Sequence, residues 1–342
     1  MSRKSSIIPV YFRPEQLNHK PLYEWTFGEK IEHPETTARA ESIVKALQQR
    51  PELFKFIMPK SFPINIIREV HDDNLITLYK TCRSLPVDKT FYPSIFPKRE
   101  YVKPNPLNIY HSGFYCFDSG TPLNSTTWQA AAWSAACATD AARDIVKGKT
   151  DYAYALCRPP GHHASSDMFG GYCYFNNAAI ATKALGMSKV AILDIDFHHG
   201  NGTQNIFYND GKVLFISIHG DPKDFYPFYT GFKHEKGLGK GYDCNMNIPL
   251  TAGVSGKEYL AIIANLVLPK IRKFRPFALI VSAGFDTFIS DPIGAFSLQT
   301  EDYYNIAKLL KTLDLPTLVV QEGGYAPEFL GENVSSFLQA FN

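Results

Sequence analysis

Residues 190–202 read VAILDIDFHHGNG, an apolar run followed at once by carboxylates and imidazoles. Asp194, Asp196 and His198 stand at alternate positions after the run 190–193. In extended backbone, alternate side chains point to the same face, so these three can project together where a strand ends. Carboxylate oxygen and imidazole nitrogen are good ligands for a divalent metal. The stretch therefore predicts a metal site at the end of a buried strand.

Short apolar runs alternate with helical patterns along the rest of the chain. Several runs are apolar at successive positions, as expected of parallel strands that are buried on both faces. Strands are predicted at 7–12, 64–67, 152–157, 190–194, 213–218, 278–282 and 317–321. Helices are predicted at 37–49, 127–147, 176–185, 256–273 and 301–313, with Ser255 and Thr300 as N-caps. The alternation predicts an α/β fold with one mostly parallel, doubly wound sheet flanked by helices.

Residues 83–126 interrupt this pattern. They hold six prolines and many aromatic side chains without a regular period. An irregular segment of this length is uncommon and usually functional. Because no linker or repeat divides the chain, we expect one domain over 1–342 with a long insertion at 83–126. We also expect a homodimer in which this insertion narrows the entrance of the other subunit's site.

The bulk composition excludes several kinds of partner. The chain is 45% hydrophobic and 20% charged, as in ordinary globular proteins. A net charge of +2 with only short basic clusters argues against nucleic acid as an obligate partner. No apolar run is long enough for a membrane span or a signal peptide core, so we expect a cytoplasmic protein. The six cysteines lack a C-x-x-C pair or a disulfide-like spacing, which predicts free thiols.

Four predicted strands end in polar, glycine-rich or proline-rich turns. The segments that follow the strands are RPPGHH at 158–163, DIDFHHGNG at 194–202, SAGFD at 282–286 and QEGGY at 321–325. Ligands of open parallel sheets bind beyond the carboxyl ends of the strands. We therefore expect all four segments to meet at one site.

The combined motifs resemble those of the arginase/histone deacetylase superfamily. They are RPPGHHA at 158–164, GGYCYFNN at 170–177, DIDFHHGNGTQ at 194–204, SAGFDT at 282–287, DP at 291–292 and EGGY at 322–325. The chain is most similar to the bacterial acetylpolyamine amidohydrolases within that superfamily. This narrower resemblance depends on the insertion and on GFYC at 113–116, TW at 127–128, DMFGG at 167–171 and HGDP at 219–222. It implies the single-domain arginase/deacetylase fold.

The resemblance also implies roles for individual residues. Zn²⁺, which Fe²⁺ or Co²⁺ could replace, would be held by Asp196, His198 and Asp286. His163 would be the general base, with His162 as its neighbouring histidine. Asp194 would orient His162, and Asn201 would orient His163. Tyr325 would donate a hydrogen bond to the oxyanion. The resemblance further implies a narrow substrate tunnel lined by Gly171, Tyr172 and Tyr226. A structural K⁺ is implied near Asp194 and Ser217.

The expected activity is hydrolysis of N-acetylpolyamines such as acetylputrescine, acetylcadaverine or acetylspermidine to acetate and free amine. Three alternatives stay open: a protein acetyl-lysine deacetylase with the same site, a non-catalytic sensor of acylated amines, and a binuclear manganese ureohydrolase. Ile109 and Gly120 align with positions at which the amidohydrolase branch can carry substrate-selecting glutamates. Recognition of a cationic substrate would then depend on Glu24, Asp118 or Asp167.

Overall fold

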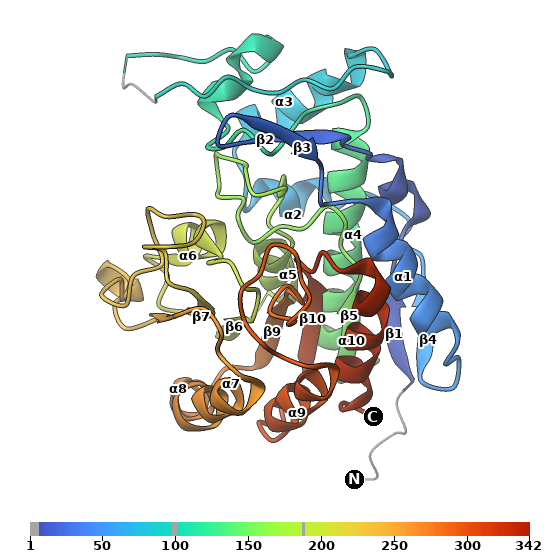
Figure 1. Ribbon diagram of the computed structural model, residues 1–342, viewed down its shortest axis with the longest axis vertical. Helices are drawn as coiled ribbons and strands as arrows, with labels where there is room; N and C mark the ends of the chain where they lie inside the picture. Colours follow the sequence, from blue (N-terminus) through green and yellow to red (C-terminus); the bar gives the residue numbers. More distant parts are fainter. Residues whose placement is uncertain (1–6, 98–100, 187–188) are drawn as a thin grey trace.

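A parallel sheet of eight strands forms the centre of the molecule in the computed structural model, which describes residues 7–97, 101–186 and 189–342 (Figure 1). The strand order is β4-β1-β5-β10-β9-β6-β7-β8, and each neighbouring pair is parallel. The strands are β1 (Ile8–Tyr11), β4 (Phe54–Ile57), β5 (Tyr152–Ala155), β6 (Val190–Asp194), β7 (Val213–Gly220), β8 (Asn245–Leu250), β9 (Ala278–Ala283) and β10 (Thr317–Gln321). The predicted α/β fold is confirmed.

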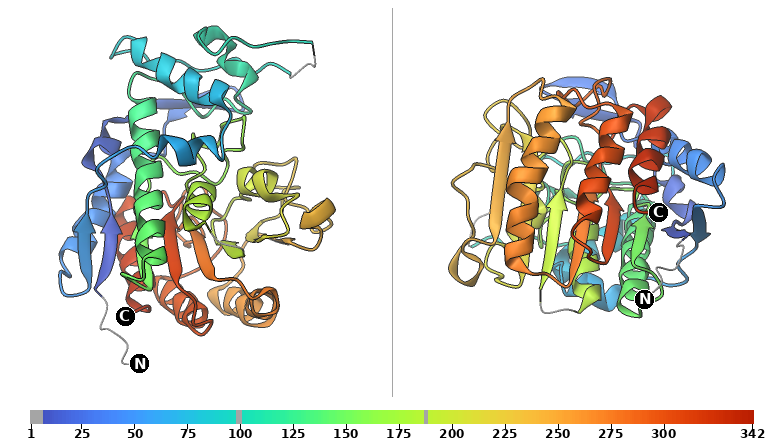
Figure 2. Two further views of the ribbon diagram at one scale, coloured as in Figure 1. Left: turned by 180° about the vertical axis from the view of Figure 1, so that it is seen from behind. Right: turned by 90° about the horizontal axis from the view of Figure 1, so that it is seen from below.

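Helices cover both faces of the sheet (Figure 2). One face packs against α1 (Thr37–Gln48), α7 (Gly256–Ile262), α8 (Leu268–Phe274), α9 (Thr300–Lys311) and α10 (Pro327–Gln339). The other packs against α3 (Asp73–Thr81), α4 (Thr127–Val146) and α5 (Asn177–Leu185). The central strands β6, β7, β9 and β10 are buried along their whole length, because both of their faces are covered.

The carboxyl ends of four adjacent strands meet at one edge of the sheet. These strands are β5, β10, β9 and β6, which lie side by side in that order. Each leads directly into one of the four polar segments that the sequence singles out. The short helix α6 (Asn201–Phe207) follows the metal-ligand segment after β6. The prediction that the four segments converge is therefore confirmed by the strand order.

Two local predictions were wrong. Residues 64–67 form a helix, α2 (Ile64–Arg68), and not a strand. A short apolar run does not distinguish the two, and here only Ile67 of this helix is fully buried. The N-cap of α9 is Gln299, so Thr300 is the first helical residue. Ser255 caps α7 as expected, with a reciprocal capping box to Glu258.

The predicted helix 256–273 contains a wider turn in its middle. A π-helical segment, Ile263–Val267, separates α7 from α8. Pro269 lies at the start of α8 and has no N–H to donate to the preceding turn. We attribute the wider turn to this missing donor.

A hairpin that was not predicted lies beyond the carboxyl ends of the sheet. Its strands are β2 (Tyr23–Thr26) and β3 (Glu29–Glu32), which pair antiparallel (Figure 1). The insertion 83–126 runs over this hairpin, and the hydroxyls of Tyr92 and Ser119 donate to backbone carbonyls of β2. Hairpin and insertion together build the wall above the sheet edge.

The remaining sequence predictions concern cysteines and membrane spans. All six cysteines are free, and five are buried. Within the described residues, no helix has the length and apolarity needed to cross a membrane.

Candidate active site

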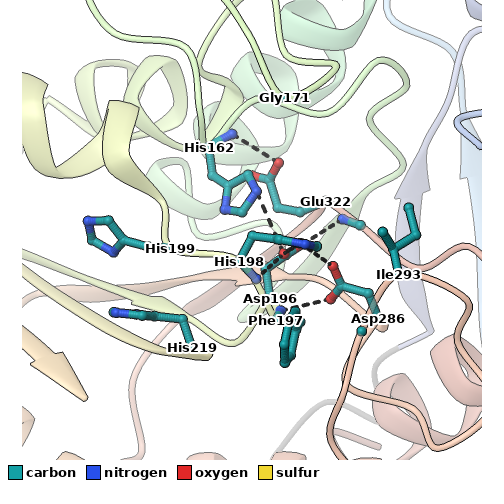
Figure 3. A network of polar contacts seen from close by, with 12 residues as sticks. His162, Gly171, Asp196, Phe197, His198, His199, His219, Asp286, Ile293 and Glu322 are labelled. Carbon is teal, nitrogen blue, oxygen red and sulfur yellow. Dashed lines mark hydrogen bonds and ion pairs between the residues drawn. The ribbon is translucent and has the colours of Figure 1, made fainter. Parts of the chain in front are cut away.

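Two carboxylates and one imidazole converge where β6 and β9 end. Asp196 and His198 lie in the turn after β6, and Asp286 follows β9 (Figure 3). Nδ1 of His198 lies 3.3 Å from Asp196 Oδ1 and 3.0 Å from Asp286 Oδ2. One potential ligand atom from each residue falls within 4.8 Å of the others. This arrangement is the metal set of three ligands that the family resemblance implies. Asp194, which the alternation in the sequence groups with Asp196 and His198, instead lies against His162, with Oδ2 2.9 Å from Nδ1.

Backbone amides hold these carboxylates in place. Gly323 N donates to Asp196 Oδ2 over 2.8 Å, and Phe197 N donates to Asp286 Oδ1 over 2.8 Å. A side chain at Gly323 would not fit, because its Cβ would lie 2.6 Å from Asp196 Oδ2 and 2.7 Å from Asp286 Oδ2. The glycine after Glu322 is therefore required for the turn to approach both carboxylates.

The donor set fits a divalent cation. Asp196 and Asp286 are both buried, and their ion pairs are with histidines. Burial and the neighbouring Asp196 raise the pKa of Asp286 to about 7. Burial opposes protonation of His198, but hydrogen bonds to the two carboxylates outweigh it and raise its pKa to about 9. Two carboxylates and one imidazole leave a coordination position for water and substrate, as in catalytic zinc sites.

The histidine pair lies beside the metal set. The rings of His162 and His163 are 4.0 Å apart, and each Nδ1 has a different partner. His162 Nδ1 lies 2.9 Å from Asp194 Oδ2, and His163 Nδ1 lies 2.6 Å from Asn201 Oδ1. A carboxylate stabilises the charged imidazole, whereas an amide oxygen only accepts a hydrogen bond.

These partners push the two pKa values in opposite directions. Burial opposes protonation of His162, but Asp196 and Asp194 outweigh it and raise its pKa well above the usual value. Burial lowers the pKa of His163 well below its usual value, and the charges of His162 and His198 add to this effect. A neutral His163 with its proton on Nδ1 presents Nε2 as a base. Opposed pKa values of this kind are typical of acid–base sites.

Tyr325 follows β10 and closes the other side of the site. Its backbone N donates to Asp291 Oδ2 over 2.6 Å, and Asp291 Oδ1 accepts from two further amides of its own turn. Arg39 donates from Nε to Gly324 O over 2.5 Å, and its guanidinium lies 4.6 Å from the Tyr325 ring centroid. Burial raises the pKa of Tyr325 well above 10, so its hydroxyl keeps its proton. The side chain is therefore a fixed hydrogen-bond donor.

Three residues of this site received no role from the sequence. They are Arg39, Asp291 and Glu322. Glu322 Oε2 accepts from Gly161 N at 2.7 Å and from His162 N at 3.1 Å, so it ties the histidine turn to β10. Burial raises its pKa to about 7. Glu322 and Asp291 were visible within the EGGY and DP motifs, whereas Arg39 lies on α1 without any local signal.

A pocket of about 430 Å³ leads to the metal set. Gly171, Tyr172 and Tyr226 line it, together with His163, His198 and Tyr325. The structure thus brings the predicted tunnel residues to the predicted chemistry. The Tyr226 ring lies 5.0 Å from the His163 ring, and the Tyr172 ring lies 5.9 Å from the Tyr325 ring.

The pocket wall also carries carboxylates. Glu24 and Asp118 line it, but Asp167 does not, so the structure separates the three candidates for cation recognition. Tyr226 donates its hydroxyl to Asp118 Oδ2 over 2.8 Å. Glu24 is only 5% exposed, and burial raises its pKa. Among the described residues that line this pocket there is no lysine or arginine.

The pair expected to hold K⁺ lies on neighbouring strands. Asp194 and Ser217 stand opposite each other in the β6–β7 register. The Ser217 hydroxyl lies 2.7 Å from His219 Nδ1 and 3.4 Å from His199 Nδ1. Figure 3 shows both imidazoles on the far side of the turn from Asp286.

Fold and site together define a metal-dependent hydrolase of the deacetylase class. The family model for the histone deacetylase domain matches residues 33–341. Acetylpolyamine amidohydrolase 2 of Pseudomonas aeruginosa is 42% identical over 98% of each chain. The acetylpolyamine amidohydrolase of Burkholderia pseudomallei is 38% identical over 97% of this chain and 98% of its own.

Solved structures agree with these sequence matches. The crystal structure of the acetylpolyamine aminohydrolase from Burkholderia pseudomallei has a TM-score of 0.91 to this chain, at 38% identity and 98% coverage of both chains. The HDA15 HD domain has a TM-score of 0.83 at 30% identity, covering 97% of this chain and 90% of its own. The chain belongs to the histone deacetylase family and is a deacetylase. The family resemblance drawn from the motifs is confirmed.

Proposed function

We propose that this chain is a zinc-dependent amidohydrolase that converts N-acetylpolyamines to acetate and free amine. The observation that supports the proposal is that His163, His198 and Tyr325 line one pocket, with the carboxylates of Asp196 and Asp286 next to His198. The relatives named acetylpolyamine amidohydrolases support the substrate class, since two of them match almost the full length of this chain.

Asp196, His198 and Asp286 would hold the zinc. When bound, zinc polarises the amide carbonyl and lowers the pKa of the attacking water. Fe²⁺ and Co²⁺ also suit an oxygen-rich site with one imidazole, so the identity of the native metal ion has to be tested as well. We assign a structural K⁺ to the neighbourhood of Asp194 and Ser217 on the family resemblance.

His163 transfers the proton in this proposal. Because Asn201 Oδ1 can only accept, it fixes the proton of neutral His163 on Nδ1 and leaves Nε2 toward the pocket. Nε2 takes the proton of the attacking water and then gives it to the nitrogen of the leaving amine. His162, kept cationic by Asp196 and Asp194, supplies electrostatic support to the reaction. No serine or cysteine nucleophile is required.

Tyr325 stabilises the charge that develops on the carbonyl oxygen. Its hydroxyl is protonated, and Arg39 and Asp291 fix the turn that carries it. A donor that is oriented before the reaction stabilises the transition state without reorganisation. Gly171 lets the opposite wall approach His163, because a Cβ there would lie 2.2 Å from His163 Cδ2.

Glu24 and Asp118 would select a cationic substrate. Both are carboxylates in an aromatic-walled pocket that lacks lysine and arginine among its described residues. The distal ammonium of an acetylated diamine or triamine would neutralise them, while Tyr172 and Tyr226 contact its alkyl chain. Glu24 thus replaces the glutamate that the amidohydrolase branch can carry at the position of Gly120.

The insertion 83–126 would form a homodimer interface. Its described part exposes large apolar side chains, namely Val87, Ile95, Phe96, Tyr101, Leu107 and Tyr110. Apolar surface of this extent is typical of a contact between proteins. Ile95 also lines the pocket, so a partner that covers the insertion would narrow the entrance.

A substrate panel tests the proposal. Purified enzyme loaded with Zn²⁺ is incubated with acetylputrescine, acetylcadaverine, acetylspermidine and an acetyl-lysine peptide, and acetate is measured. We expect hydrolysis of the acetylpolyamines, much slower turnover of the peptide, and loss of activity in the chelated control. Faster turnover of the peptide would favour the protein acetyl-lysine deacetylase. Acetate production no higher than in the chelated control would contradict the enzyme assignment itself.

A further inference from the structure

Three aromatic residues of the pocket that leads to the metal set have an unfavourable backbone conformation. They are Phe27, Tyr172 and Phe228, with φ values of 50°, 64° and 68°. All three line this pocket, and they are half of the six non-glycine residues with positive φ in the described ranges of the chain. A positive φ is rare for bulky side chains, and such strain is concentrated at functional sites. The strain therefore indicates a function for these rings.

Phe27 is the residue for which this conformation is least expected. It precedes Gly28, at φ 87°, in the two-residue turn that joins β2 to β3. Asparagine is preferred at the first position of such a turn, because both turn residues have positive φ. The side chain of Phe27 is 90% exposed, so burial in a core does not compensate for the strain. Neither the turn nor the packing of the hairpin thus explains a phenylalanine here.

Phe27 and Phe228 lie together at the entrance of the pocket. Their rings are 6.4 Å apart and meet edge to face, although one belongs to the hairpin and the other to the segment after β7. Phe228 is 45% exposed, whereas His163 and Tyr325 at the inner end are 4% and 9% exposed. A substrate chain that extends out of the pocket therefore passes these two rings.

The entrance also carries a carboxylate that the proposed function does not use. Asp224 lines the pocket and is exposed, whereas Glu24 is buried in the wall. The described residues that line this pocket include no lysine or arginine. Beyond Glu24, the pocket thus offers a second carboxylate and two aromatic faces to a positive charge.

We propose that Phe27, Phe228 and Asp224 bind the outer ammonium of an acetylated triamine, so that the enzyme prefers a triamine to a diamine. Aromatic faces attract an ammonium group, and a carboxylate binds it by a charge-assisted hydrogen bond. The rings also contact the methylene groups between the two charges. The inference rests on the proposed function, since the acetyl amide and the inner ammonium occupy the site described above.

Two substrates that differ only in their outer arm test this preference. Acetylputrescine has one ammonium. Spermidine that is acetylated at its aminobutyl end repeats this structure and adds an aminopropyl arm with a second ammonium. Steady-state kinetics of the zinc-loaded enzyme should give kcat/KM about fivefold higher or more for the acetylspermidine, as expected of one added contact between an ammonium and aromatic rings.

Phe27→Asn and Phe228→Asn remove the rings without disturbing the backbone, because asparagine tolerates a positive φ. Each variant should lower kcat/KM for the acetylspermidine about threefold to fivefold and leave that for acetylputrescine unchanged. Asp224→Asn should have the same selective effect, since it removes the charge at the entrance. Phe27→Asn should also raise Tm, because the ring that it removes is exposed and its backbone is strained.

Arg275→Asn provides the matched control. Arg275 has a φ of 55° at the end of α8, is exposed and does not line the pocket. The control relieves the same kind of strain and should keep the wild-type preference for the triamine.

Two results would overturn the inference and leave the proposed function intact. One is an equal kcat/KM of the wild type for both substrates, and the other is an equal fall for both substrates in Phe27→Asn. If the wild type released acetate from neither substrate, the proposed function would be contradicted, and the inference with it.

Discussion

Oε2 of Glu24 occupies the space that a side chain at Gly120 would need, because a Cβ built on Gly120 would lie 2.8 Å from it. The carboxylate of Glu24, on the hairpin strand β2, thus lies where a side chain of residue 120 on the insertion would lie if that residue were not glycine. Glu24 accepts hydrogen bonds from the hydroxyls of Thr26 and Tyr172, both of which are neutral. No lysine or arginine is found among the described residues that line this pocket, so the buried carboxylate of Glu24 is available to a cationic substrate.

Glu24→Gln therefore tests substrate recognition. The amide keeps an acceptor for the two hydroxyls but removes the charge, so we expect KM for acetylpolyamines to rise about tenfold or more, with kcat little changed. Loss of one charge-assisted hydrogen bond of about 1.5–3 kcal/mol corresponds to this range. Steady-state kinetics on acetylputrescine and on a neutral acetamide provide the measurement. Glu29→Gln, on the exposed strand β3, is the control and should leave both constants unchanged.

Tyr325→Phe should lower kcat by about 10²–10³ and change KM little. The hydroxyl acts on charge that is present only in the transition state, and loss of one such donor has this magnitude. Tyr172→Phe is the contrasting variant, because its hydroxyl contacts Glu24 on the pocket wall. That variant should raise KM for a cationic substrate and preserve kcat. An unchanged kcat in Tyr325→Phe would remove Tyr325 from the mechanism.

Gly171→Ala should abolish most activity without unfolding the protein. Gly171 has a φ of +56°, and an added Cβ would lie 2.2 Å from His163 Cδ2. The imidazole would have to move away from the position that Asn201 defines, so we expect kcat to fall at least a hundredfold. Gly148→Ala is the control for the effect of placing alanine at a positive φ. Gly148 has a φ of +64°, and no heavy atom lies within 4 Å of the added Cβ.

The control variant should lose about 1–2 kcal/mol of stability and keep full activity, because alanine disfavours a positive φ. Circular dichroism and thermal unfolding of both variants separate folding from catalysis. If Gly148→Ala and Gly171→Ala lost activity to the same extent, the contact with His163 could not be the cause.

The strands at the centre of the sheet were predictable because both of their faces are buried. The runs at 190–193 and 278–281 are apolar at successive positions, and the structure buries every residue of β6 and β9. The edge strands β4 and β8 were not predicted. Part of each of these strands is accessible to solvent, so polar and apolar residues alternate irregularly along it. The sequence therefore lacks the continuous apolar run that indicates a buried strand.

The candidate site was predictable where its signal is local. Asp196 and His198 stand at alternate positions after an apolar run, and this pattern indicates that they are metal ligands. The EGGY motif indicates a functional role for Tyr325. The support of that tyrosine was not predictable, because Arg39 reaches Gly324 O across 285 residues of chain. The replacement of a side chain at Gly120 by Glu24 likewise depends on how the hairpin packs against the insertion. Such contacts arise from tertiary structure alone.

Tyr110→Glu tests the proposed dimer. Tyr110 is 73% exposed on the insertion, and a charge in a buried interface would weaken association. We expect the wild type to have the mass of a dimer in light scattering at micromolar concentration and the variant to shift toward monomer. Tyr242→Glu is the matched control, because Tyr242 is 67% exposed and lies outside residues 83–126, at the end of the turn Gly239–Gly241. A monomeric wild type would contradict the assignment of the insertion as an interface.

Because His71 is buried, we expect the protein to lose stability in mild acid. Burial lowers the pKa of His71 to about 4, whereas an unfolded histidine titrates near 6.5. Between these values the unfolded chain binds a proton that the folded protein excludes, so the free energy of unfolding falls as pH decreases below 6.5. The contribution is complete above 6.5 and amounts to at most about 1.4 kcal/mol per pH unit inside the window.

His71→Gln should remove this contribution. Glutamine can still accept the hydrogen bond that Asn176 N donates to His71 Nε2 over 2.9 Å, but it does not titrate. Urea unfolding at pH 7, 6 and 5 should therefore show a shallower loss of stability in the variant than in the wild type. His234→Gln changes an imidazole that is exposed to water and should keep the wild-type slope. Parallel slopes for wild type and His71→Gln would mean that His71 takes up its proton without unfolding, and that its burial does not control the acid response.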